Sequence, residues 1–131
     1  MRAYLLILAG LPLMAQTETN IACAERLEIP DYPPLAKAAR IAGGITASLT
    51  VGPDGSAQTI TLTTDSGTRP HPILRPSVEK SLGASKFAKV CAGKQVTLVF
   101  NFILGDAPAP IVLFGYPNRF WITAPPMLVQ P

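Results

Sequence analysis

The 131-residue chain has little of what metal sites and nucleic-acid interfaces are built from. Its two cysteines and one histidine are too few for a structural zinc site within one chain. Only 15% of the residues are charged, and no run of lysine and arginine is interleaved with aromatic residues, so a nucleic-acid partner is not expected. Because 48% of the residues are hydrophobic, a disordered polyelectrolyte is excluded as well. The length fits one domain.

One long apolar run is present, and it stands at the start of the chain. Met1-Arg2 supplies a positive charge, residues 3–15 are almost entirely apolar, and a polar stretch begins at Gln16. This layout is typical of a secretory signal peptide cleaved after Ala15, and it predicts a periplasmic or secreted protein. A retained segment is the alternative, but a helix over residues 3–15 would cover only about 20 Å of a hydrocarbon core about 30 Å thick.

Export to an oxidising compartment gives the two cysteines a role. Cys23 and Cys91 are the only thiols, so we predict a disulfide between them, with two free thiols as the alternative. A catalytic cysteine has little support, because the single histidine, His71, lies between two prolines and there is no Cys-x-x-Cys motif.

Hydrophobic periodicity predicts two helices and a strand hairpin. We expect the first helix to start at Pro33-Pro34 and to end at Gly43-Gly44. Alternating apolar residues predict strands over 45–51 and 57–64, joined by a turn that closes with Asp-Gly. The second helix is expected over 73–85. Its inward stripe is predicted to be Leu74, Val78, Ser81, Leu82 and Ser85, with Phe87 as a core anchor after it.

Residues 95–104 form the strongest predicted strand. Its even-numbered residues are all apolar and point one way, while Thr97, Val99, Asn101 and Ile103 point the other way. The order of elements predicts an α+β fold in which two helices pack on one face of a three- to four-stranded, largely antiparallel sheet.

The predicted domain is followed by a proline-rich tail. We expect a signal peptide over 1–15, an extended segment over 16–29, a domain over 30–105 and the tail over 106–131. Residues 111–114 and 119–123 of the tail are apolar enough that leaving both in water would expose a large patch. We therefore expect the tail to fold back, with one of these segments beside residues 95–104; the alternative is a tail that is itself a ligand for another protein.

Several motifs, taken in order, resemble the TonB C-terminal domain family. They cover about residues 30–104, and the resemblance implies the fold of that family. The motifs are Tyr32-Pro33-Pro34 with the alanine-rich helix and Gly43-Gly44, the Asp54-Gly55 hairpin, the break at Asp65-Ser66-Gly67, Phe87, Gly93 and the strand 96–102.

The resemblance also implies a protein-interaction module without catalysis or a cofactor. In the family, the last strand of the domain pairs with an extended peptide of a receptor, so a protein partner in the cell envelope, such as an outer-membrane receptor, is expected. The side chains of the matching strand expected to contact that partner are Gln95, Thr97, Val99, Asn101 and Ile103. A homodimer, or a stand-alone structural envelope protein with a closed sheet edge, is the alternative.

The chain departs from the full energy transducers of that family. Only residues 16–32 separate the expected cleavage site from the domain, where the transducers have a membrane anchor and a long spacer. Ala88-Lys89 also replaces the proline that follows the core aromatic residue in the family. Participation in energy transduction therefore stays open.

No catalytic arrangement is predicted. Asp65, Ser66 and His71 are close in sequence, but they fall in a loop bounded by prolines, without a nucleophile elbow or a signature for an oxyanion hole. The remaining carboxylates are scattered, and we expect no enzyme activity and no metal site.

Overall fold

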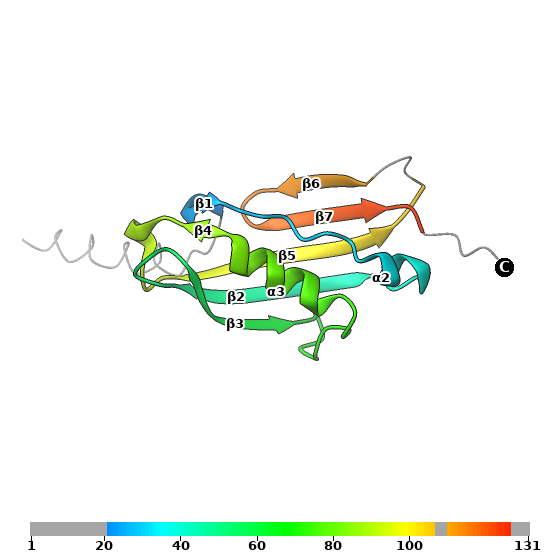
Figure 1. The fold of residues 1–131 in the computed structure, drawn as a ribbon, viewed down its shortest axis with the longest axis horizontal. Coiled ribbons are helices and arrows are strands. Elements are labelled where there is room, and N and C mark those ends of the chain that lie inside the picture. The colour runs from blue at the N-terminus through cyan, green and yellow to red at the C-terminus, as the bar shows by residue number, and fades with distance from the viewer. Residues whose placement is uncertain (1–20, 107–109, 127–131) are drawn as a thin grey trace, which may run out of the picture.

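A computed structural model describes residues 21–106 and 110–126, and five strands of it form one sheet in the order β3-β2-β5-β7-β6. Figure 1 shows helix α3 lying across one face of this sheet, with the N-terminal segment beside it. The sheet strands are β2 (Gly43–Val51), β3 (Ala57–Thr63), β5 (Gln95–Leu104), β6 (Ile111–Gly115) and β7 (Arg119–Ala124). The other elements are η1 (Ile21–Cys23), β1 (Ala24–Arg26), α2 (Pro34–Ala38), α3 (Arg75–Ala84), β4 (Lys86–Phe87) and η2 (Lys89–Cys91).

The expected signal peptide, residues 1–15, lies outside the described residues. Within the described part of the chain, no helix has the length and apolar character needed to cross a bilayer.

The α+β class is confirmed, but the sheet has more strands than the three or four predicted, and it is mixed where a largely antiparallel sheet was expected. The sheet has five strands, and although β2–β3, β2–β5 and β6–β7 are antiparallel, β5 and β7 run parallel. The reason lies in the tail hairpin. Its inner strand, β7, buries every second residue, whereas β6 is largely exposed and lies outermost. Placing the second strand of the hairpin inside makes it run in the direction of β5.

The core lies between this sheet and the elements on its helical face. The even-numbered residues of β5 from Val96 to Phe102 are buried there, as predicted, and Phe102 meets Tyr32 edge-on with ring centroids 5.3 Å apart. The predicted stripe of α3 is buried along its whole length, and Phe87 is 1% exposed. The tail adds to the same core, because Phe120, Ile122 and Ala124 of β7 are buried in it.

Helix α2 ends earlier than the sequence predicts. Arg40 adopts a left-handed conformation, with φ of 58°, so the helix stops before the glycine pair. The N–H of Arg40 donates to the carbonyl of Lys37, and the N–H of Ile41 donates to the carbonyl of Ala36 at 2.8 Å. These bonds form a Schellman motif, in which an arginine occupies the position that glycine usually takes.

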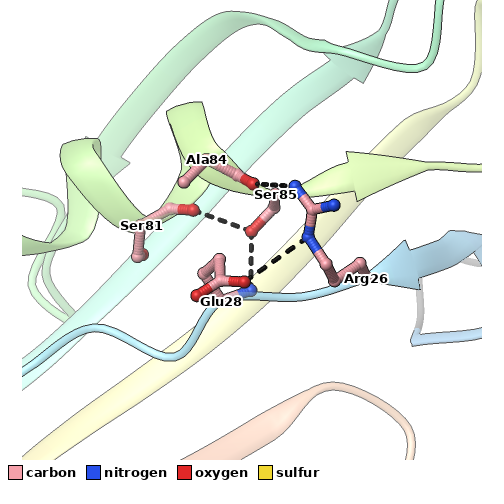
Figure 2. A network of polar contacts seen from close by, with 5 residues as sticks. All are labelled: Arg26, Glu28, Ser81, Ala84 and Ser85. Atoms are coloured by element: carbon pink, nitrogen blue, oxygen red, sulfur yellow. Dashed lines mark hydrogen bonds and ion pairs between the residues drawn. The ribbon is translucent and has the colours of Figure 1, made fainter.

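The N-terminal strap, residues 23–33, overlaps the segment over 16–29 that was predicted to be extended, of which residues 16–20 lie outside the described residues. Its strand β1 pairs with β4, and Figure 2 shows the next residues meeting the C-terminal end of α3. Arg26 Nη2 donates to the carbonyl of Ala84 at 2.9 Å, and the N–H of Glu28 donates to Ser85 Oγ at 2.9 Å. The strap thus satisfies the Ala84 carbonyl, one of the backbone groups that the end of a helix leaves unpaired.

The turn of the β2–β3 hairpin reaches β4. Gly55 has φ of 87°, its carbonyl accepts a hydrogen bond from the N–H of Phe87 at 2.8 Å, and a Cβ at Gly55 would clash with the carbonyl oxygen of Phe87. Only glycine therefore fits at this position.

Cys23 and Cys91 lie at disulfide distance, with Cα atoms 5.9 Å apart and a sequence separation of 68. A cross-link of this loop length stabilises a fold by about 4 kcal/mol in the chain-entropy model. We expect the Cys23→Ser/Cys91→Ser variant to unfold at a clearly lower urea concentration than the oxidised wild type. Denatured, unreduced wild-type protein should give no alkylated thiol by mass spectrometry; two alkylated cysteines would contradict the cross-link.

Phe120 tests whether the tail hairpin belongs to the core. Its ring stacks on Phe100 with centroids 5.5 Å apart, so Phe120→Ala should lower the free energy of unfolding by about 3–5 kcal/mol. The measurement is urea unfolding followed by circular dichroism. Val90→Ala is the control, because Val90 is 84% exposed and its truncation should change stability by less than about 0.5 kcal/mol. Equal effects of the two substitutions would contradict a docked hairpin.

Candidate functional site

The strand expected to bind a partner, β5, lies inside the sheet. Strand β2 pairs with one side of it, and β7 pairs with the other side from Val99 to Leu104. Two further hydrogen bonds extend this second contact: the N–H of Val99 donates to the carbonyl of Asn118 at 2.9 Å, and the N–H of Gly105 donates to the carbonyl of Ala124 at 3.1 Å. The side of β5 that was expected to pair with a partner peptide is thus occupied by the tail of the same chain.

The first three residues predicted to contact a partner differ in their surroundings. Gln95 is exposed and lies in the register of β2 alone. Thr97 is half-buried, and its carbonyl accepts a hydrogen bond from Asn118 Nδ2 at 2.9 Å. Val99 is buried, although it lies on the open face of the sheet. Of these three, only Gln95 is freely available to a partner in this arrangement.

Asn101 and Ile103 complete the predicted set. Asn101 Nδ2 donates to the carbonyl of Phe120 at 3.4 Å, so this side chain also binds the backbone of β7. A Cβ at Gly44 would lie 2.8 Å from Asn101 Oδ1, and the glycine therefore leaves the room that Asn101 occupies. Ile103 remains partly exposed at the far end of the strand. The structure brings the five residues onto one face, and their contact with a partner stays a prediction.

The two open edges of the sheet differ in kind. The outer strand at one end, β3, mixes threonines with apolar residues, and Thr59-Ile60 lies opposite the single residue Leu49 in a bulge where Thr59 has φ of 52°. Bulges and polar residues are common protections of an exposed edge. At the other end, β6 carries no charge, and its side chains from Ile111 to Phe114 are 44–60% exposed.

Sequence reasoning did not identify β6 as an edge. Its composition, four consecutive apolar residues in a segment too short for a helix, is typical of a buried strand and therefore gave no signal of an exposed edge.

A groove of about 380 Å³ lies beside β6 on the helical face. Its walls come from the N-terminal strap, α2 and the tail, and are largely apolar, with one carboxylate and one ammonium group. They are formed by Ile29, Pro30, Asp31, Tyr32, Pro34, Lys37, Pro110, Val112 and Ile122. The Tyr32 hydroxyl donates to the carbonyl of Ile41, and burial raises the pKa of its phenol, so Tyr32 acts here as a neutral wall of the groove.

A second hollow, of about 400 Å³, brings together Asp65, Ser66 and His71. Its polar groups are engaged locally: Ser66 Oγ lies 3.1 Å from the hydroxyls of both Thr64 and Thr68, and His71 Nδ1 accepts a hydrogen bond from the N–H of Ile73. No hydrogen bond joins these three residues to one another among those of the described chain. In the same described residues, no three His, Cys, Asp or Glu side chains are grouped as metal ligands would be.

The family comparison matches the part of the chain that ends at β5. The Gram-negative bacterial TonB protein C-terminal family matches residues 28–104, more than half of the chain. No curated protein matches the sequence. Domains of this family are interaction modules of envelope proteins, and they generally interact with outer-membrane receptors. Because the match runs from residue 28 to the end of β5 and covers α2, α3 and strands β2 to β5, the chain belongs to the TonB C-terminal family.

Proposed function

We propose that the protein is a periplasmic interaction module that binds an extended peptide of another envelope protein, such as an outer-membrane transport protein, by adding it as a strand to β5. The observation that carries this proposal is the pairing of β7 with β5. Strand β7 lies outside the family region, yet it occupies the edge of the family's last strand. The edge therefore supports strand addition within the chain, and an external peptide would take the place of β7.

The contacts of β7 indicate what such a peptide must offer. Six residues of β7 are in register with Val99 to Leu104, and alternate side chains enter the core. Backbone pairing supplies affinity in strand addition, while pockets for alternate side chains supply selectivity. Burying a Phe or Ile side chain contributes roughly 1.5–3 kcal/mol. A competing peptide therefore needs apolar residues at alternate positions, with an aromatic residue where Phe120 stacks on Phe100.

The tail hairpin is the internal competitor of that peptide. A segment tied to its site by a short connection acts at an effective concentration in the millimolar range. The parallel ladder between β5 and β7 is slightly less stable per residue than an antiparallel one. Exchange is thus opposed mainly by the buried side chains of β7, and weakening those should favour the external peptide.

A second candidate is a stand-alone structural envelope protein whose sheet edge is closed permanently by its own tail. The observation that favours it is the same closed edge: from Val99 to Phe102 both sides of β5 are paired, and β7 alone continues the pairing to Leu104. The two candidates differ in whether β7 can be exchanged.

The test uses a labelled peptide with the sequence of residues 119–124, flanked by polar residues. Phe120→Ala removes a buried ring from the internal strand, and the peptide restores it, so its Kd should fall at least about tenfold relative to the wild type. Val78→Ala is the matched control, because it truncates a buried side chain of α3 and leaves the hairpin intact. Fluorescence anisotropy measures the binding, and circular dichroism verifies that both variants are folded.

A version of the peptide with proline in place of its isoleucine should not bind, because proline removes a donor from the ladder. If the unmodified peptide binds Phe120→Ala no better than Val78→Ala, strand exchange is wrong and the structural candidate is favoured.

A further inference from the structure

Within the described residues, strand β6 is an edge that carries none of the usual protections. In that part of the chain it pairs only with β7, and Figure 1 shows it outermost in the sheet. Its five residues, Ile-Val-Leu-Phe-Gly, include no charged residue and no proline, and its register with β7 contains no bulge. Natural edge strands are normally blunted by such features, as β3 is at the other end of this sheet. The exposed backbone and apolar side chains of β6 therefore fit a partner strand.

We propose that the partner is a second copy of this chain, paired antiparallel through β6 about a two-fold axis at Leu113. In this register Val112 lies opposite Phe114 of the second copy, and Ile111 lies opposite its Gly115. Because the strand carries no charge, pairing it with itself brings no like charges together. A two-fold interface also forms every contact away from the axis twice, so one complementary contact between different residues is doubled.

The helical face of β6 supplies such a contact. Val112 and Phe114 are in register with Ile122 and Phe120 of β7, whose side chains are buried, so all four share the helical face. Val112 and Ile122 line the groove of about 380 Å³ between the tail and the N-terminal strap. Phe114 packs on Phe120 of its own chain with ring centroids 5.0 Å apart and is still 47% exposed, so in the dimer its free side lies opposite Val112 of the second copy, at the border of that copy's groove.

The open face is complementary as well. Leu113, 60% exposed, meets its own equivalent at the axis. A Cβ at Gly115 would lie 2.6 Å from Cζ3 of Trp121, so the indole ring covers the space above this glycine. Ile111 of the second copy, placed opposite Gly115, packs against that ring. Both faces and the backbone edge of β6 are thus covered by one partner, and that partner is the chain itself.

This dimer goes beyond the proposed peptide binding, because it uses β6 and not β5. The two are linked, however: an interface that includes the hairpin stabilises its docked position by mass action. Dimerisation would hold the β5 edge closed and would make peptide exchange weaker at higher protein concentration.

The test is sedimentation velocity of the purified, oxidised protein over a dilution series. The wild type should sediment as a dimer that dissociates on dilution. Leu113→Lys places two ammonium groups at the axis and should raise the dimer Kd by more than about tenfold. Thr61→Lys is the matched control, because Thr61 is exposed on β3 at the opposite edge, and it should leave the dimer unchanged.

Cross-linking tests the register. Directly opposed residues of an antiparallel pair have Cα atoms about 4.5–5.5 Å apart, within the range that a disulfide bridges. Leu113→Cys should therefore form a covalent dimer under mild oxidation, whereas Thr61→Cys should not. A wild type that is monomeric at every concentration, a dimer that persists in Leu113→Lys, or a Leu113→Cys protein that fails to cross-link would overturn the proposal. Because none of these measurements involves the peptide, they fail or succeed independently of strand exchange at β5.

Discussion

The parallel ladder between β5 and β7 organises the rest of the molecule. It joins the region shared with the TonB C-terminal family to a hairpin outside that region, and it does so along six residue pairs. The ladder buries Phe120 against Phe100 and completes the core on that side of the sheet. It also moves the open edge of the sheet outward from β5 to β6. The edge at which we propose that a partner peptide binds and the edge that this chain exposes are therefore two different strands.

The two ends of the described chain play complementary parts. The tail extends the sheet sideways, while the N-terminal strap covers part of its helical face and is fixed by Cys23–Cys91, by β1–β4 pairing and by the polar contacts with α3 shown in Figure 2. The groove beside β6 lies where these two ends approach one another. Its shape is thus set by segments at both ends of the family region, and a change in either end alters it.

Local patterns in the sequence predicted most elements of the fold. Residues 95–104 were identified with the correct bounds because every even-numbered residue of the strand is apolar, and the stripe of α3 was identified by its helical spacing. The end of α2 was misplaced, because the glycine pair is a stronger signal than Arg40, whose left-handed conformation depends on hydrogen bonds to Lys37 and Ala36. Strands β1 and β4 are too short to show a period.

For the candidate site, the sequence predicted which face of β5 each residue occupies, but not which strands lie beside β5. Alternation tells which face of a strand a residue occupies, and Thr97 and Asn101 do lie on the open face. It does not tell which strand lies next to which, so the extent of pairing along β5 and the exposure of β6 could not be read from the residues alone. A half-buried pattern in 119–124 and a uniformly apolar 111–115 are compatible with either order of the two strands.

The contact between Gly55 and Phe87 restricts the number of residues in the turn of the β2–β3 hairpin. Hairpin turns on a protein surface usually accept inserted residues at little cost. Here the turn is bound by its backbone to β4, which leads directly into the segment carrying Cys91. An insertion in the turn would carry Gly55 past its partner and disturb the anchoring of the N-terminal strap at the same time. The length of this hairpin is therefore fixed by a strand that is distant in sequence.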